Sequence, residues 1–230
     1  MDLVIFDVDG TLTATTGVDD QSMVAAVRAV MGFTIADTDW GNYLHSTDQG
    51  LTIETSERQL GRRPTGDEIA AIKARFFQEL RERIGRDPGS CRAVEGAREM
   101  LARVRESGEW RVGIASGAWA ESAAIKLGAA RVEVAGLPAT FSHAAEDGRP
   151  LFREEIIAKT MAALAGSGRP SRVVYVGDGV WDARAARKLN IGFVGVRHDG
   201  REERLRNEGV ARIVRGYADL EGFVGLLRGA

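Results

Sequence analysis

The chain has 230 residues, of which 44% are hydrophobic and 28% charged, and its net charge is −2. This length can supply one sizeable core, or a core domain with a smaller insertion. Because there is no basic excess and no block of like charge, we expect no nucleic-acid partner. The single cysteine, Cys91, excludes an internal disulfide framework and a cysteine-based metal cluster.

The first residues and the apolar runs indicate where the protein resides. The N-terminus meets aspartates at Asp2 and Asp7, without a basic segment or a long apolar run, so we expect no signal peptide. No stretch approaches the ~20 apolar residues that a membrane span needs. We therefore expect a soluble, cytoplasmic protein without a membrane partner, either a monomer or a homodimer.

A long helical segment follows the first predicted strand, which is the apolar run at residues 3–6. Between Thr13 and Arg92 the sequence predicts helices and no strand. The second of these helices begins at a capping box, in which Glu68 follows Thr65 by three positions. Apolar residues at helical spacing mark two faces: Val24, Val27, Val30 and Met31 on the first, and Ile69, Ile72, Phe76, Leu80 and Ile84 on the second. An all-helical block in this place is typical of a cap over a sheet.

Strands and helices alternate in the rest of the chain. Further buried strands are predicted at residues 112–115, 173–176 and 193–196, and helices at residues 97–105, 119–127, 154–164 and 181–189. This alternation predicts an α/β fold with a doubly wound, Rossmann-like parallel sheet. We assign residues 1–13 and 92–230 to this core and residues 14–91 to an inserted all-helical cap.

The strongest chemical signal is the run Asp7-Val8-Asp9-Gly10-Thr11, directly after the first strand. In an open α/β sheet, ligands bind beyond the carboxyl ends of the strands. Two carboxylates stand there on an irregular turn, and Gly10 lets the backbone approach a ligand closely. The alternative is a plain turn in which the aspartates bond to their own backbone.

Two other strands also end in polar residues. The run at residues 177–182 contains Asp178 and Asp182, and Ser116-Gly117 follows the strand at residues 112–115. Asp178 falls at the same sheet edge as Asp7, where clustered carboxylate oxygens suit magnesium. Asp182 begins the next helix, where helix capping is the alternative role. A serine hydroxyl with free N–H groups at a helix start can bind an anion, although an N-cap is the commoner role.

In this order, the DxDGT run, the serine at the second strand end and the GDxxxD run resemble the haloacid dehalogenase superfamily over the whole chain. The place of the predicted cap is similar to the helical-cap subgroup, which includes phosphoglycolate phosphatase-like enzymes. The true dehalogenases of the family lack the second aspartate, so Asp9 argues for phosphoryl transfer. The resemblance implies a magnesium-dependent hydrolase of a small phosphorylated metabolite, with a phosphoglycolate-like phosphate monoester as the first candidate.

The resemblance assigns roles to the acidic residues. Asp7 would attack phosphorus and form an aspartyl-phosphate. Asp9 would protonate the leaving alcohol and later take a proton from water, for which its carboxyl needs surroundings that favour a bound proton. Mg²⁺ would be held by Asp7, the Asp9 backbone carbonyl and Asp178, with Asp182 orienting these groups. This requires the side chains of Asp7 and Asp178 to converge.

The resemblance also implies groups that hold the phosphate. Ser116, Thr11 and a basic residue would stabilise the transferring group, and Gly10 and Gly117 would lie against the substrate.

In the family, the basic residue most commonly belongs to a Lys-Pro pair shortly before a helix, and this sequence has no such pair in that region. The candidates are Arg149, Arg153 and Lys159. Since the helix start faces the reactive edge, Lys159 would lie about 9 Å beyond Arg153 at 1.5 Å per residue. Arg153 is also similar in position to an arginine of some phosphoglycolate phosphatase-like proteins. We place it first, with Lys159 and Arg149 as rivals.

Substrate choice is expected to come from the loop at residues 43–50, which resembles the specificity loop of the family. His45, Thr47 and Asp48 are the candidates for substrate contact, and ordinary loop polarity is the alternative. His45 is not expected to bind the metal, because the predicted site is built from oxygen ligands.

The sequence leaves alternative functions, some of which would use the same residues. A phosphomutase or a phosphonate hydrolase on the same scaffold would use the same Asp7 and Asp9. A receiver-type signalling protein, phosphorylated on aspartate, is about half as long, and its phosphoacceptor follows a later strand. A dinucleotide-binding domain needs G-x-G-x-x-G after the first strand, where Asp7 to Thr11 stand instead.

Overall fold

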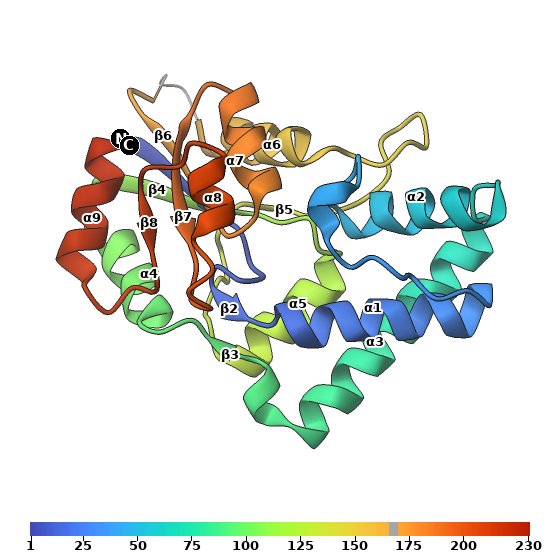
Figure 1. Ribbon diagram of the computed structural model, residues 1–230. Helices are drawn as coiled ribbons and strands as arrows, with labels where there is room; N and C mark the ends of the chain where they lie inside the picture. The colour runs from blue at the N-terminus through green and yellow to red at the C-terminus, as the bar shows by residue number, and fades with distance from the viewer. Residues whose placement is uncertain (166–169) are drawn as a thin grey trace.

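The computed structural model of the protein describes residues 1–165 and 170–230. Six strands form one sheet in the order β5-β4-β1-β6-β7-β8, and every neighbouring pair is parallel (Figure 1). Their bounds are Asp2–Phe6 (β1), Trp110–Ala115 (β4), Ala139–Thr140 (β5), Val173–Gly177 (β6), Gly192–Val196 (β7) and Ile213–Val214 (β8). The predicted α/β fold with a parallel sheet is confirmed. The two-residue strands β5 and β8 were not predicted, because they are too short to form an apolar run.

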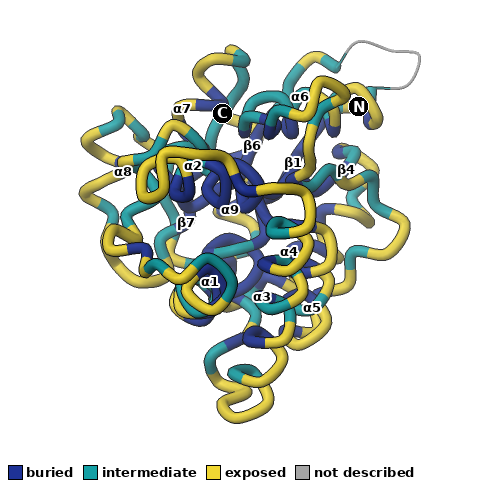
Figure 2. The backbone as a smooth tube through the Cα atoms, turned by 90° about the vertical axis from the view of Figure 1, so that its right-hand side faces the viewer, coloured by how far each residue is buried: buried dark blue, intermediate teal, exposed yellow. Residues whose placement is uncertain are grey.

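Side chains of β1 alternate between the two faces of the sheet, and helices cover both faces. Leu3 and Ile5 join the apolar cluster that contains residues of α6 and α7, whereas Val4 and Phe6 join the cluster that contains residues of α4, α5 and α9. The helices of the sheet unit span Ala97–Glu106 (α4), Ala120–Ala130 (α5), Arg153–Ala165 (α6), Val180–Lys188 (α7), Glu203–Asn207 (α8) and Leu220–Gly229 (α9). Figure 2 shows the buried strands enclosed by helices whose outer faces are exposed.

The inserted segment contains three helices, Thr16–Met31 (α1), Asp48–Leu60 (α2) and Gly66–Arg86 (α3). The capping box forms as predicted, with Thr65 accepting from the Glu68 N–H and Glu68 accepting from the Thr65 N–H. The helix that it begins is the third and not the second of the segment, because α2, which takes in residues 48–50 of the expected loop, was not predicted. Helices α1 and α3 pack through a buried cluster that includes Val27 and Phe76. Among the described residues, no helix combines the length and the apolar character needed to cross a membrane.

The two connections between the sheet and these helices lie side by side. Thr13–Ala14 (β2) pairs antiparallel with Arg92–Ala93 (β3), although the sequence predicted no strand between Thr13 and Arg92. Two-residue strands leave no readable alternation, and only the pairing reveals them. The division into a core of residues 1–13 and 92–230 and a cap of residues 14–91 stays a prediction.

Candidate active site

The carboxyl ends of β1, β4 and β6 meet at one edge of the sheet. Phe6 at the end of β1 pairs in register with Ile114 of β4 and Val176 of β6. The loops that follow these strands therefore begin at the same level, with Asp7, Ser116 and Asp178 in the first positions after the strands or close to them. This register brings together residues that are far apart in the sequence.

Three carboxylates converge at this edge, as the sequence analysis required of Asp7 and Asp178. Each of Asp7, Asp178 and Asp182 offers an oxygen within 4.8 Å of the others, and all three residues are buried. Gly10 makes room for them: its φ is +69°, and a Cβ at this position would lie 2.1 Å from Asp178 Oδ2. A side chain at residue 10 would therefore displace the Asp178 carboxylate.

Burial sets the electrostatics of this cluster. Burial raises the pKa of Asp7 to about 7. The positive charge of Arg153 lowers this pKa, and the negative charges of Asp182 and Asp9 add to the rise. Burial, followed by Asp182 and Asp7, also raises the pKa of Asp178 well above its ordinary value. A divalent cation favours the ionised forms of such groups, and an all-oxygen donor set fits Mg²⁺. The residues present therefore suit a magnesium ion.

Asp182 lies in the cluster but is already bonded to the protein. Its Oδ2 accepts from the Gly179 N–H at 3.0 Å, and its Oδ1 accepts from the Tyr175 hydroxyl at 3.3 Å. It is the third residue of α7, which begins at Val180, so it also stabilises the start of this helix. These bonds fit a residue that orients its neighbours better than one that binds a metal directly.

Arg153 is the first residue of α6, and its guanidinium points into the site. It is 7% exposed, its Nη1 lies 3.2 Å from Asp7 Oδ1, and its Nε lies 3.4 Å from Asp182 Oδ1. Its Nη2 donates to the Ser46 carbonyl at 3.0 Å, so it also contacts the loop before α2. Of the three cations considered from the sequence, it is the one that lies beside Asp7.

The other two cations do not line the cavity beside Asp7, and their role as phosphate ligands stays an alternative prediction. Lys159 is exposed further along α6, since that helix runs away from the reactive edge. Arg149 is occupied by Glu155 at 2.6 Å and Asp147 at 3.3 Å.

Ser116 and Gly117 line the cavity at the end of β4. Ser116 is 1% exposed, and its Oγ accepts from the Ala118 N–H at 3.3 Å. A Cβ on Gly117 would lie 2.5 Å from the Ser46 carbonyl oxygen and 2.7 Å from Arg153 Nη2, so glycine is required for the loop and the arginine to meet.

The Thr11 side chain is fully buried and does not line the cavity, so its part in holding the phosphate stays a prediction. Its hydroxyl has no hydrogen-bond partner among the described residues. Its carbonyl accepts from the Tyr217 hydroxyl at 3.1 Å, which fits a packing role behind the site.

Only Asp48 of the three loop candidates reaches the cavity. It is buried, and its Oδ2 accepts from the Trp119 N–H at 2.8 Å. Thr47 instead caps α2 by accepting from the Gly50 N–H, and it donates to the Leu151 carbonyl. His45 stacks on Phe152, with ring centroids 4.6 Å apart. Neither His45 nor Thr47 lines the cavity, and substrate contact by these two residues stays a prediction.

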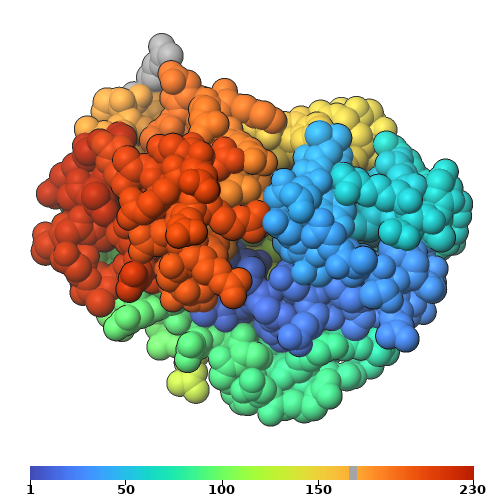
Figure 3. All heavy atoms as spheres, viewed as in Figure 1, coloured from blue at the N-terminus to red at the C-terminus, as the bar shows by residue number. Residues whose placement is uncertain are grey.

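The helical segment supplies cavity residues that the sequence analysis missed. Asp19, Asp20 and Met23 of α1 line a cavity of about 60 Å³ together with Asp7 and Arg153. Trp40 also lines it and donates from Nε1 to Asp20 Oδ1 at 2.7 Å. In the space-filling view, the blue and cyan atoms of this segment close against the orange and red atoms of the sheet unit (Figure 3).

Lys126 was also missed, although it contacts the proposed acid–base residue. It is fully buried in α5, and its Nζ lies 2.6 Å from both Asp9 Oδ2 and Asp19 Oδ1. The sequence analysis expected surroundings that help Asp9 hold a proton, whereas the structure places an ammonium against it. The one available signal was a single lysine within the mainly small and apolar stretch Ala120–Ala130.

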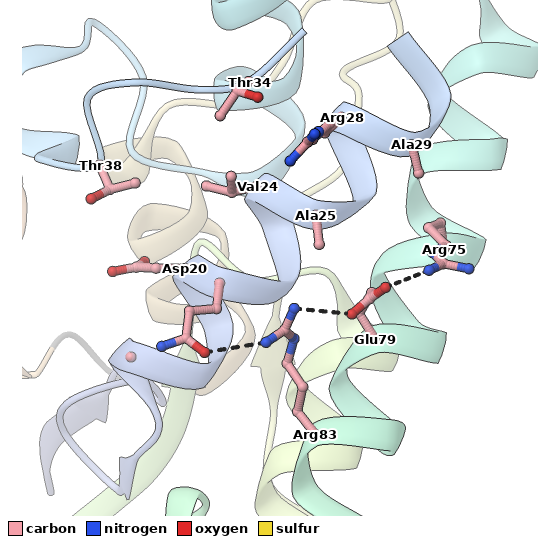
Figure 4. Close-up of a pocket in the computed structure, with 12 residues that line it drawn as sticks. Asp20, Val24, Ala25, Arg28, Ala29, Thr34, Thr38, Arg75, Glu79 and Arg83 are labelled. Atoms are coloured by element: carbon pink, nitrogen blue, oxygen red, sulfur yellow. Dashed lines mark hydrogen bonds and ion pairs between the residues drawn. The ribbon is translucent and has the colours of Figure 1, made fainter. Parts of the chain in front are cut away.

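A larger groove of about 860 Å³ lies on the outside of α1 and α3 (Figure 4). Its buried carboxylate, Glu79, is bonded to Arg75 at 2.5 Å and to Arg83 at 3.2 Å. Apart from Asp20, which borders both spaces, the groove and the 60 Å³ cavity share no lining residue. We therefore locate the candidate chemistry in the smaller cavity, beside Asp7.

Comparison with known proteins identifies the family. The model of the haloacid dehalogenase-like hydrolases matches residues 1–190. The chain belongs to this family. The structure of this haloacid dehalogenase (HAD)-like hydrolase resembles that of a hydrolase from Pseudomonas syringae, with a TM-score of 0.73, 20% identity and 98% of each chain covered. No curated protein matches the sequence.

Two further structures share the fold of this HAD-like hydrolase. A candidate β-phosphoglucomutase from Bacteroides vulgatus has a TM-score of 0.71 and 18% identity, and 100% of this chain and 89% of that chain are covered. A predicted phosphoglycolate phosphatase from Haemophilus somnus has a TM-score of 0.60 and 15% identity, with 96% of this chain and 97% of that chain covered. The chain is thus a hydrolase by family, with a fold shared by proteins of several named activities.

Proposed function

We propose that this protein is a magnesium-dependent phosphatase that hydrolyses a small phosphate monoester through an aspartyl-phosphate on Asp7. The observation that carries the proposal is the cavity in which Asp7, Asp178 and Arg153 meet. A carboxylate nucleophile, oxygen ligands for a metal and a cation for phosphate oxygens are the parts that phosphoryl transfer needs.

The metal would be held by the Asp7 and Asp178 carboxylates and the Asp9 carbonyl, with Asp182 orienting this set. When bound, it would neutralise charge that would otherwise keep an anionic ester away from an anionic nucleophile. The raised pKa values of Asp7 and Asp178 support a site that needs a cation to keep its carboxylates ionised.

Two displacement steps follow from this arrangement. Asp7 attacks phosphorus, the bond from phosphorus to the alcohol oxygen breaks, and Asp9, which must enter this step protonated despite the ammonium of Lys126 beside it, gives that oxygen its proton. Water then attacks the aspartyl-phosphate, Asp9 takes a proton from it, and Asp7 and inorganic phosphate are released. Arg153 and the Ser116 hydroxyl hold the transferred oxygens throughout.

The cavity wall bears on the choice of substrate. Phosphoglycolate is the candidate implied by the resemblance, and its leaving group carries a carboxylate. The wall supplies Asp20 and Asp48, besides Asp19, which is paired with Lys126, and Arg153 is the one basic residue among the described side chains that line the cavity. Like charges at short range repel, so the wall favours a neutral or positively charged leaving group.

A screen of phosphate monoesters with and without Mg²⁺ tests the proposal. It includes phosphoglycolate, a sugar phosphate and phosphoethanolamine, with release of phosphate and isomerisation of the sugar phosphate both followed. Asp7→Asn should abolish phosphate release while the circular dichroism spectrum and the melting temperature remain those of a folded protein. Normal turnover by this variant would refute the assignment, and isomerisation without net hydrolysis would identify a mutase.

A further inference from the structure

Lys126 is a buried cation that the steps above do not use. It lies within α5 and is 0% exposed. Removing an ammonium from water is costly unless the group is paired and hydrogen-bonded. Its partners therefore determine what such a residue can do.

Two carboxylates from different parts of the chain pair with Lys126. Its Nζ lies 2.6 Å from Asp9 Oδ2, in the loop after β1, and 2.6 Å from Asp19 Oδ1, in the first turn of α1. Burial alone would lower the pKa of Lys126, but Asp19, Asp9 and Asp48 together raise it above its ordinary value. One ammonium thus joins α5, the loop after β1 and α1.

The Asp9 carboxylate is held on its other side as well. The hydroxyl of Thr15, the N-cap residue of α1, donates to Asp9 Oδ1. The hydroxyls of Thr15 and Thr13 lie 2.8 Å apart, and Thr13 donates to the Val8 carbonyl at 3.1 Å. Because both of its oxygens are engaged, the Asp9 carboxylate cannot turn without breaking one of these bonds.

We propose that Lys126 is a positioning residue, which holds the Asp9 carboxylate in its working orientation and, through Asp19, ties that orientation to the seating of helix α1. The inference rests on the proposed role of Asp9 in the function above. It assigns to α1 a part in aligning the acid–base group, in addition to its part in closing the cavity.

The primary test is Lys126→Met, which removes the ammonium and keeps most of the side-chain volume. Misplacing a catalytic group by about 1 Å costs about 10²-fold in rate, and acid–base catalysis contributes about 10²–10⁴-fold. We therefore expect kcat to fall by about 10²-fold or more, with KM changed by less than about threefold.

A matched control is Lys73→Met. Lys73 also joins an inserted helix to α5, with its Nζ 3.4 Å from Glu121 Oε1, but this pair is partly exposed and does not line the cavity. Such surface pairs contribute at most about 1 kcal/mol to stability. Because neither Lys73 nor Glu121 lines the cavity, kcat should remain within about twofold of the wild-type value.

The double variant Lys126→Met/Asp19→Asn separates positioning from simple stabilisation. The single variant leaves two carboxylates without their cation, and the second substitution removes one of these charges. We expect the double variant to regain melting temperature but not kcat. Recovery of kcat to within about threefold of wild type would overturn the positioning role.

All variants are assayed beside wild type and Asp9→Asn on the same ester with Mg²⁺. A wild-type protein without activity would refute the proposed function itself. An active wild type with an equally active Lys126→Met variant would overturn the positioning role and leave the proposed function intact.

Discussion

At the scale of single residues, burial separates the three cations that the sequence analysis considered. Arg153 contacts Asp7 because it is the first residue of α6, at the end of the helix that faces the strand ends. Arg149 satisfies its guanidinium with Glu155 and Asp147 on the surface. Position relative to the start of α6 therefore matters more than charge in choosing the phosphate ligand.

Substitution of Arg153 tests this choice. Arg153→Met removes the cation beside Asp7 and should lower kcat/KM by about 10³-fold, because arginines on a transferring phosphoryl group contribute on that order. Arg153→Lys keeps the charge without the planar guanidinium and should show a smaller loss. Steady-state kinetics on one ester measure both.

The control for these substitutions is Arg149→Met, which should change kcat/KM by less than about threefold, as its salt bridges lie outside the cavity. If Arg149→Met lost as much activity as Arg153→Met, the assignment of the phosphate ligand would be wrong.

At the scale of elements, the segment after β4 joins the sheet to the inserted helices. Trp119 is 1% exposed and packs edge-on against Phe76 of α3, with ring centroids 5.8 Å apart. Its backbone N–H donates to Asp48, and its Nε1 donates to Gln49 Oε1 at 3.2 Å, both at the start of α2. The same short segment thus carries Ser116 into the cavity and holds the inserted helices over it.

Trp119→Ala should weaken both the fold and the binding of substrate. Removing a buried tryptophan costs about 3–5 kcal/mol, and loss of the contacts to α2 and α3 should raise KM. Trp110→Ala is the matched control, because Trp110 is 4% exposed but lies at the opposite end of β4. Urea unfolding should show that both variants are destabilised. Steady-state kinetics should show a raised KM in Trp119→Ala alone. An equal rise of KM in both variants would count against a link between the contacts of Trp119 and substrate binding.

At the scale of the whole molecule, buried acids dominate the cavity. Burial raises the pKa of Asp7 to about 7 and the pKa values of Asp20 and Asp48 to about 6, from an ordinary value of 3.8. Hydrogen bonds from arginines instead lower the pKa values of Glu68 and Glu155 to about 2. These two groups change the stability only at pH values below about 4.5, at which the unfolded chain takes up protons.

Metal-free protein should therefore lose stability as the pH rises from about 4 to about 7. In that window the folded protein keeps protons on the raised carboxyls, while the unfolded chain has released them, so the free energy of unfolding falls with rising pH. One pKa unit corresponds to about 1.4 kcal/mol, and we expect a decline of a few kcal/mol in total. Urea unfolding in EDTA at several pH values measures it.

Mg²⁺ should act in the opposite direction, because it binds the ionised carboxylates. The stabilisation by Mg²⁺ should grow between about pH 5 and pH 7.5, whereas the free energy of unfolding of the metal-free protein should fall over the same range. Asp20→Asn should flatten part of the metal-free slope. A metal-free stability that rises over this window would contradict the assignment of raised pKa values.

Much of the fold and part of the site were predictable from the sequence. Apolar runs and helical periodicity are local, so they predicted the parallel sheet, and they placed Asp7 and Asp178 at ends of strands that share one edge. Helix geometry was enough to favour Arg153 over Lys159. By contrast, nothing local distinguishes a loop residue that points inward from one that serves its own turn. The sequence therefore could not separate Asp48, which reaches the cavity, from His45 and Thr47, which do not.

The sequence by itself determined the four longer strands β1, β4, β6 and β7, the helices α4 to α7 that alternate with them, the capping box at Thr65 and the acidic motifs, since each depends on residues that are near neighbours in the chain. Only the tertiary structure decided that Lys126 meets Asp9 and Asp19, and that Trp119 packs between the sheet unit and the inserted helices. Those contacts join residues as many as 117 positions apart. A buried charge is stable only where distant partners surround it, and no spacing along the chain records which partners the fold will bring.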